Sequence, residues 1–290
     1  MNAPAWLVAV CATACLTLTV SAATVSAPSS SWTVLSGNYD YLADQQTGQP
    51  AGDIVGSGTN GGFFTTFNDN GSASNTDGTL GFRLRLDAAG GNKNNIAFDR
   101  VAWVGIDANN DAVLDAFIGL GMQGSSSTLG IYAPGTDLNT SPATTSVAST
   151  AYKSYSIDSS NYNYRPVDYT TDGGTTNDAT TSTTGDPDYY LSFMVNFRDL
   201  VNFLGTKGIS ITDQSGLRYV VATSTQMNSL NQDLGGVNGG VNSPTSWSDL
   251  GGFSPTVSAH GTPVPAVPEP SAFFLGASSV LLACLRRRRA

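Results

Sequence analysis

Short segments in which apolar and polar residues alternate recur along the chain, and they most limit the folds open to it. From Tyr189 to Phe197 every second residue is large and apolar. From Leu80 to Asp87, phenylalanine and leucine alternate with Arg83 and Arg85. A period of two places one set of side chains on a buried face and the other set toward solvent. Each of these segments is therefore predicted to be a half-buried β-strand.

Further segments of similar composition predict that strands dominate the fold. Strand-type residues occupy 31–35, 62–67, 96–106, 113–119, 129–133, 152–157, 209–212 and 217–223. Helical spacing of apolar residues is clear at 198–204, which predicts one short helix. Many short strands with turn-rich connections are typical of an antiparallel sandwich. We expect an all-β fold, a jelly-roll-like or immunoglobulin-like β-sandwich with one short helix.

The connections have a different composition. Residues 140–149 and 170–184 are rich in Thr, Ser, Asp and Gly and show no apolar periodicity. We expect both to be exposed loops. Residues 228–241 predict a glycine-rich loop, and 262–267 a proline-containing linker.

The first 22 residues predict a secretory signal peptide. The run from Trp6 to Val20 is uncharged, and three small residues follow at 21–23. An apolar core followed by small residues is typical of a cleaved signal peptide, although no Lys or Arg precedes Trp6. We expect cleavage after Ala22 or Ala23. A lipoprotein modified at Cys15 is the alternative.

The last residues combine three features in a fixed order. They are the motif Val267, Pro268, Glu269, Pro270 and Ser271, the apolar run 272–285, and the cluster Arg286, Arg287, Arg288 and Arg289. As a helix, the apolar run would be about 21 Å long, shorter than the ~30 Å hydrocarbon core of a bilayer. Arginines favour the cytoplasmic side, which places Glu269 on the outer side of the inner membrane. We expect transient anchoring followed by cleavage, with an ordinary tail anchor as the alternative.

This tail resembles the PEP-CTERM sorting signal of Gram-negative bacteria. The resemblance implies processing by an exosortase, after export by the Sec machinery, and an association with exopolysaccharide and biofilm matrix. It covers about the last two dozen residues. The expected organisation is a signal peptide at 1–22, a secreted body at 23–261, and a linker with a hydrophobic sorting helix at 262–290. The expected location is the cell surface, the outer envelope or the extracellular matrix.

The expected body is acidic and free of cysteine. Cys11, Cys15 and Cys284 all lie in the two terminal segments. The body carries nine basic residues against twenty-one aspartates, a net charge of minus twelve. This charge disfavours nucleic acid as a partner. Without disulfides, the body must be held by its core, by bound metal ions, or by both.

One aspartate-rich segment predicts a calcium site. Side-chain oxygens of Asp107, Asn109, Asp111 and Asp115, with the carbonyl of Val113, have a spacing that lets them converge on one ion. The segment resembles the first nine positions of the calcium loops of EF-hand, dockerin and thrombospondin-type repeats. It departs from them because Ala112 replaces the turn glycine and Ile118 replaces the bidentate glutamate. A hairpin site for Ca²⁺ is one interpretation, and an Asx-rich turn without metal is the other.

Two further sets of residues are candidates for contact with sugars. Asn228, Asn231, Gln232 and Asp233 precede two glycines and predict either a hydroxyl-binding or second ion site or a hydrogen-bonded turn. Seven tyrosines stack on sugars or pack in the core; they are Tyr152, Tyr155, Tyr162, Tyr164, Tyr169, Tyr189 and Tyr190.

Signatures of catalysis are sparse. His260 is the sole histidine and lies near the linker, and the body has neither cysteine nor glutamate. A His-based triad or zinc site therefore has little material. We expect a structural or adhesive protein of the exopolysaccharide matrix and no enzyme. The alternatives are a carbohydrate-binding module and a secreted glycosidase using paired aspartates.

Overall fold

The computed structural model of the chain describes residues 23–35, 44–46, 48–92, 95–123, 127–179 and 186–265. The expected signal peptide and the sorting motif with its apolar run and arginines lie outside these residues. Within the described part of the chain, no helix has the length and apolar character needed to span a membrane.

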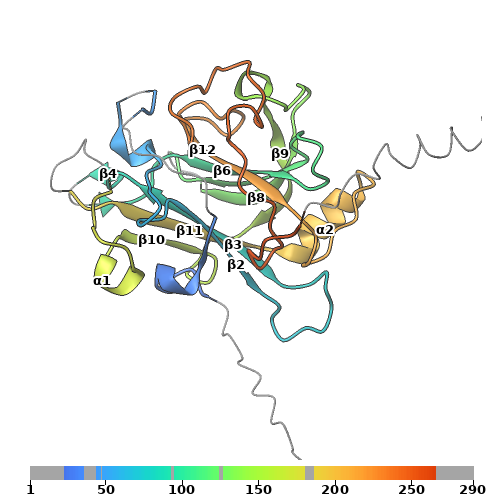
Figure 1. Cartoon of the computed structure of the whole chain (residues 1–290), viewed down its shortest axis with the longest axis horizontal. Coiled ribbons are helices and arrows are strands. Elements are labelled where there is room, and N and C mark those ends of the chain that lie inside the picture. Colours follow the sequence, from blue (N-terminus) through green and yellow to red (C-terminus); the bar gives the residue numbers. More distant parts are fainter. Residues whose placement is uncertain are drawn as a thin grey trace, which may run out of the picture.

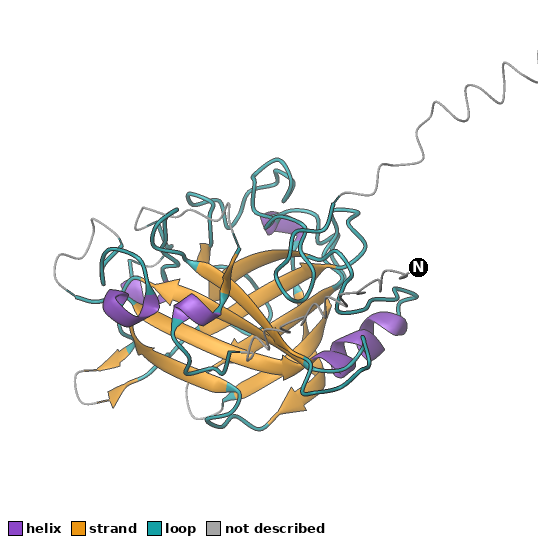
Figure 2. Ribbon diagram, turned by 60° about the horizontal axis from the view of Figure 1, so that its bottom comes forward, coloured by secondary structure: helices purple, strands orange, loops and turns teal. Residues whose placement is uncertain are grey.

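Two antiparallel sheets form the body, as expected for an all-β fold (Figure 2). The five-stranded sheet has the order β1 (Thr33–Val34), β2 (Phe63–Asn68), β3 (Thr79–Leu86), β11 (Tyr189–Asn196), β10 (Tyr162–Pro166). The six-stranded sheet has the order β13 (Asp233–Leu234), β12 (Arg218–Ser224), β6 (Val101–Asp107), β7 (Ala116–Gly121), β8 (Thr128–Pro134), β9 (Val147–Tyr155). A separate hairpin joins β4 (Gly91–Asn92) to β5 (Asn95–Ile96). The helical elements are α1 (Tyr169–Asp172), α2 (Phe197–Gly205) and the 3₁₀ turns η1 (Ser29–Ser31), η2 (Pro50–Gly52) and η3 (Pro142–Thr144).

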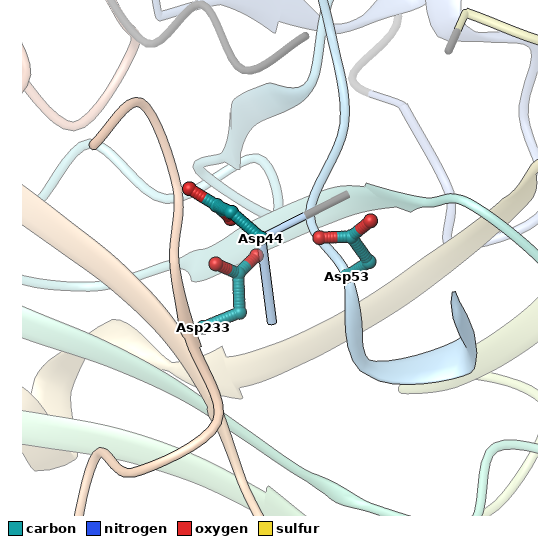
Figure 3. Close-up of side chains that lie close together, drawn as sticks. All are labelled: Asp44, Asp53 and Asp233. Carbon is teal, nitrogen blue, oxygen red and sulfur yellow. The ribbon is translucent and has the colours of Figure 1, made fainter. Parts of the chain in front are cut away.

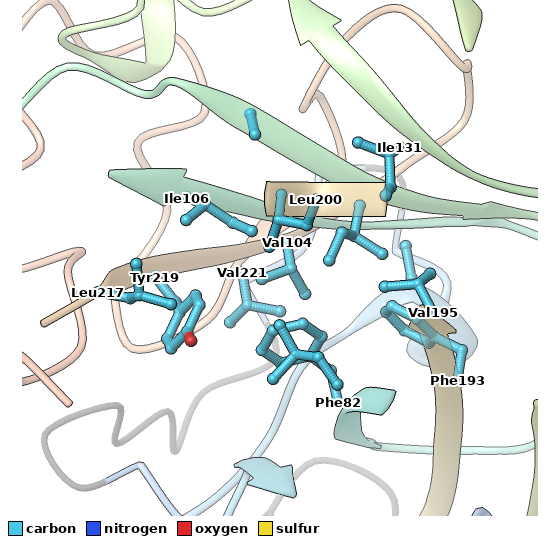
Figure 4. Close-up of a cluster of buried hydrophobic side chains, with 14 of the residues drawn as sticks. Phe82, Val104, Ile106, Ile131, Phe193, Val195, Leu200, Leu217, Tyr219 and Val221 are labelled. Carbon is cyan, nitrogen blue, oxygen red and sulfur yellow. The ribbon is translucent and has the colours of Figure 1, made fainter. Parts of the chain in front are cut away.

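The largest apolar cluster lies between the two sheets. Phe82 and Phe193 from the five-stranded sheet meet Val104 and Val221 from the six-stranded sheet (Figure 4). In β11, Leu191, Phe193 and Val195 all face this cluster, as the alternation predicts. Leu200 of α2 joins it, so the predicted short helix packs on the core. Burial of this shared apolar surface holds the two sheets together.

The expectation of half-buried strands at 80–87 and 189–197 is wrong, because the outer faces of β3 and β11 are covered as well. Arg83 and Arg85 point away from the main core, yet both are 0 % exposed. Residues 23–32, here called the strap, lie across this outer face and bury Arg83 beneath Trp32. The strap comes from the N-terminal side of the body, and β3 alone carries no signal for it.

The outer face of the six-stranded sheet is covered by a second segment, residues 228–253. Trp103 and Phe117 on this face pack with Leu234, Val237 and Trp247 of the cover. The two covers lie on opposite sides of the molecule (Figure 1). Part of 140–149 is also buried, contrary to the expectation of an exposed loop, because it contains η3 and the start of β9.

A few predicted elements differ from the structure. Residues 96–106 split between β5 and β6, since β5 turns back to pair with β4. Residues 209–212 form no strand; the amide of Ile209 caps α2 by donating to the carbonyl of Leu204, and Ile211 packs in the core. The strand β10 and the one-turn helix α1 have no periodic signal and were not expected.

Candidate functional site

A polar groove of about 680 Å³ lies on the outer face of the five-stranded sheet, beside the strap. Its volume falls within the roughly 300–1,000 Å³ that ligand sites occupy. Strand register builds its floor. Asn68 of β2 and Asn196 of β11 both pair with Thr79 of β3, so three polar residues form a row across adjacent strands. Neighbouring strands are about 4.8 Å apart, which sets the spacing of the row.

The next row on the same face has a glycine at its centre. Thr66 and Met194 both pair with Gly81, which has no side chain. A Cβ at Gly81 would lie 2.9 Å from side-chain carbons of both neighbours. The side chains of Thr66 and Met194 therefore close over the glycine, and a larger residue at this position would force them apart.

The walls of the groove come from segments distant in sequence. The strap contributes Ala23, Thr24 and Ser26, and the turn before β10 contributes Ser159, Ser160 and Asn161. The end of β9 and the start of α2 complete the lining with Lys153, Tyr155 and Asp199. Most of the lining residues carry an amide or a hydroxyl group, and each such group can both donate and accept hydrogen bonds. A lining of this kind suits a ligand rich in hydroxyl groups.

The charges in the groove compensate one another. Among the described residues that line it, Lys153 and Asp199 are the charged pair, with 3.9 Å between Nζ and Oδ2. The hydroxyl of Tyr155 donates to the same carboxylate over 2.9 Å. Burial, followed by this contact with Asp199, raises the pKa of Tyr155, so the phenol stays protonated. The groove therefore presents a net neutral lining.

The predicted calcium loop closes through its own hydrogen bonds. Asp107 accepts from the amides of Asn110 and Ala112 and forms an ion pair with Arg218. Asp111 accepts from the amide of Val113 over 2.9 Å. A calcium ion at this loop would compete with these donors for the same oxygens. Calcium binding here stays a prediction.

The remaining members of that loop have local partners as well. Asn109 Oδ1 accepts from the amide of Asp111, and its Nδ2 donates to the Asp111 carboxylate. Asp115 accepts from the amide of Ala108 over 2.9 Å, and burial raises its pKa. These side chains therefore bond to residues close to them in the sequence, as in an Asx-type turn.

Carboxylates do come together elsewhere in the described part of the chain. One group comprises Asp44, Asp53 and Asp233, whose ligand atoms lie within 4.8 Å of one another (Figure 3). Asp233 accepts from the amide of Ile54 over 2.6 Å, and Asp44 accepts from the amide of Gly239. Three oxygens at this separation could hold a divalent cation.

A second group comprises Asp87, Asp178 and Asp188, with ligand atoms within the same 4.8 Å limit. Asp188 is fully buried and pairs with Arg85 at 2.5 Å. Burial raises the pKa of Asp188 to about 6, although Arg85 opposes the shift. The guanidinium of Arg85 already places a positive charge beside Asp188. The arginine therefore fills the electrostatic role that a metal ion would have.

The second predicted ligand set is not assembled on one surface. Asn228 is exposed, whereas Gln232 and Asp233 are buried. Asn231 accepts from the amide of Thr225 and from the hydroxyl of Ser224, which holds a turn. Ligand binding by these residues stays a prediction.

The tyrosine-rich region is mostly structural. Tyr164 packs on Tyr189 at a ring distance of 5.0 Å, and Tyr190 lies beneath the strap. Tyr152 and Tyr169 are exposed. From this set, Tyr155 lines the groove. It is the single sequence signal that pointed toward this site, because the other lining residues come from strands and turns brought together by the fold.

Comparison with known protein families, with curated proteins and with solved structures finds no match for this chain.

Proposed function

We propose that this chain is an exported protein whose tail is cut by an exosortase, and that its body binds a neutral polysaccharide of the extracellular matrix. The binding gives it a structural or adhesive role in exopolysaccharide or biofilm. The body is a jelly-roll-like or immunoglobulin-like sandwich that carries the groove on one outer face.

The polar groove is the observation that supports this proposal. Its row of Asn68, Thr79 and Asn196 offers hydrogen-bonding groups at the regular spacing of the sheet. A polysaccharide also repeats its hydroxyl groups at regular intervals. The pairing of Lys153 with Asp199 neutralises the charged part of the lining, which favours a neutral polymer over an acidic one.

Binding is favoured over hydrolysis at this groove. Glycosidases require two carboxyl groups on either side of the scissile bond. Among the described lining residues, Asp199 supplies one carboxylate, and Tyr155 and Lys153 already contact it. A groove with this lining holds a glycan without a second acid to cleave it.

The test of glycan binding is calorimetry on the purified exported protein with a panel of soluble polysaccharides. The panel contains a neutral glucan, mannan and galactan, and one polyuronate. We expect a neutral member to bind. Asn68→Ala and Asn196→Ala should each weaken that binding about threefold to tenfold, the value of one or two hydrogen bonds. The control is Asn238→Ala, an exposed asparagine of the opposite cover.

Two outcomes would contradict this assignment. Equal affinity in both groove variants would place the ligand elsewhere. A loss confined to Asn228→Ala would favour the predicted ligand set at 228–233.

The proposed route is tested by mass spectrometry of the native protein from cells with and without the processing enzyme. We expect the chain to end near Glu269 in wild-type cells and to retain Ala290 in cells without the enzyme. An intact Ala290 in both strains would refute the sorting proposal.

Stabilisation by calcium is the second part of the proposal. Two variants distinguish the two candidate locations of the ion. A calcium-dependent rise in the thermal midpoint that Asp111→Ala abolishes would assign the ion to the predicted loop. A rise that Asp53→Asn abolishes would assign it to the group with Asp44 and Asp233. No rise in the wild-type protein would remove calcium from the proposal.

A further inference from the structure

The strap is attached to the five-stranded sheet by a small apolar cluster. Ala23, Val25 and Trp32 from the strap pack with Phe64 and Met194 of the sheet. Val25 is 1 % exposed and Trp32 5 % exposed. The strap therefore docks through specific side chains.

Arg83 is the polar centre of this attachment. Its Nε donates to Ser192 Oγ over 2.7 Å, within the sheet. Its two terminal nitrogens donate to the strap, to the carbonyl of Val25 and to the hydroxyl of Ser29, each over 2.9 Å. Trp32 of the strap lies 4.3 Å from the guanidinium, in cation–π geometry. Two of the three acceptors of Arg83 thus belong to the strap.

No carboxylate among the described residues forms an ion pair with Arg83. Burial, with the nearby charge of Arg165, lowers the pKa of Arg83 to about 9, so it remains charged at neutral pH. A buried cation requires all its donors to be satisfied. Undocking the strap would remove two acceptors and the ring of Trp32 from the guanidinium, so the strap and Arg83 depend on each other.

A second clamp holds the middle of the strap. The carboxylate of Asp172 in α1 accepts from the amide of Ser29 over 2.9 Å and pairs with Arg165 at 2.5 Å. Arg165 also donates to the carbonyl of Ala27. The strap is thus attached by charged groups at two places.

The same strap forms one wall of the groove. Ala23, Thr24 and Ser26 line it, while Arg83 does not. The groove therefore has its full lining only while the strap is docked.

We infer that the groove binds its polysaccharide only while the strap is docked. Arg83 is the positioning residue, because it lies outside the groove and holds the strap where the strap forms the wall. This inference rests on the proposed function of the groove. The population of the docked state then sets the apparent affinity. Ligand binding should in turn favour docking, since both occur in the same state.

The experiment uses the exported protein and the neutral polysaccharide that binds it most tightly. Arg83→Met removes the donors, and Val25→Asn disrupts the strap without changing the sheet. Both should weaken binding at least about tenfold, as expected if the docked state falls to a tenth of the molecules. The matched control is Arg218→Met in β12 of the six-stranded sheet, where the arginine also has a carboxylate and a ring as partners, Asp107 and Phe253. It should change binding less than twofold.

Fluorescence of Trp32 reports docking independently of binding. The signal is isolated by subtracting the spectrum of the same protein carrying Trp32→Phe. In Arg83→Met we expect a red shift that saturating polysaccharide reverses. A red shift that persists at saturating polysaccharide would contradict the coupling of binding to docking. Near-ultraviolet circular dichroism confirms that the sheets remain folded; if Arg83→Met fails to fold, Val25→Asn carries the same measurements.

The outcomes separate the inference from the function on which it rests. If the wild-type protein binds and a folded variant with exposed Trp32 binds equally well, the inference fails and the groove remains a glycan site. If the wild-type protein binds none of the polysaccharides, both the function and the inference fail.

Discussion

The two sheets of this protein are covered on their outer faces in different ways. The six-stranded sheet places Trp103 against Tyr132 and beneath a cover that contains Trp247. The five-stranded sheet places Arg83 beneath the strap and Arg85 against Asp188 and the carbonyl of Thr176. The first cover is held mainly by apolar burial, which is large and insensitive to pH. The second depends on charged hydrogen bonds, which are sensitive to the loss of a single partner.

The comparison explains where the groove lies. An apolar cover excludes water and leaves few polar groups for a ligand. The strap covers only part of its sheet, so Asn68, Thr79 and Asn196 beside it line the groove. Position on the sheet and chemistry of the cover therefore decide together which face can bind.

The largest expected effect lies under the apolar cover. Trp103 is fully buried and lies over Gly119, where a Cβ would come within 2.0 Å of its ring. Trp103→Ala should lower the free energy of unfolding by about 5 kcal/mol, near the top of the range for a buried aromatic. Urea denaturation measures this. A loss below about 2 kcal/mol would mean that the cover contributes little.

The next largest expected effect lies on the outer face of the five-stranded sheet, where Arg85 is buried. Asp188→Ala leaves Arg85 buried without its carboxylate, 2.5 Å away in the native protein. Removing one partner of a buried pair costs about 3 kcal/mol or more. Denaturant unfolding of Asp188→Ala and of Arg85→Met/Asp188→Ala measures the cost. The double variant should recover part of the loss, and no recovery would contradict the pairing.

A smaller effect distinguishes the strap from the apolar cover, because the attachment of the strap depends on pH. Burial opposes ionisation of Asp172, but hydrogen bonds from Arg165 and from the amides of Ser29 and Asp168 lower its pKa from 3.8 to about 2. A lowered carboxylate pKa stabilises the folded state above pH 4, and the contribution, on the order of 2 kcal/mol, is lost as the pH falls toward 2.

Fluorescence of Trp32 should accordingly be constant from pH 5 to pH 8 and shift below pH 4. The matched control is Asp172→Asn, in which the pH-dependent step should disappear. A shift of equal size in that variant would assign the transition to other carboxylates.

The smallest effect tests the hydrogen bonds of one buried hydroxyl beneath the apolar cover, that of Thr145. The indole nitrogen of Trp247 donates to Thr145 Oγ1 over 3.1 Å in a buried site. Thr145→Val keeps the shape but leaves the indole without its acceptor and the carbonyl of Ser141 without its donor, 2.7 Å away, which should cost about 1–2 kcal/mol. The thermal midpoint measures this, with Thr145→Ser, which keeps the hydroxyl, as the control. An unchanged midpoint would show that these bonds add nothing to apolar packing.

Local periodicity predicted the inner face of each sheet correctly and the outer face poorly. In β11, the apolar residues at 191, 193 and 195 enter the main core, as the alternation requires. In β3 the same pattern led to the expectation of exposed arginines, although Arg83 is fully buried. Period-two alternation tells which residues share a face, but not what lies over that face.

The candidate site could be predicted from the sequence even less well than the outer faces of the strands. The groove joins the strap, three adjacent strands, a turn and the start of α2. Its residues are ordinary asparagines, serines and threonines, which are also the commonest turn residues. The aspartates at 107–115 gave a clearer motif, yet Asp107 is paired with Arg218 in the structure.

The sequence by itself determined the all-β class, the inner faces of the strands and the acidic, cysteine-free composition of residues 23–261, and it predicts the residues that direct export and sorting. These follow from local chemistry and spacing. The tertiary structure decided which segment covers each sheet, that Arg83 is buried, and that a groove forms beside the strap. Such features depend on contacts between residues far apart in the chain, such as the hydrogen bond from the amide of Ser29 to Asp172. No local sequence pattern specifies which distant residues will be in contact.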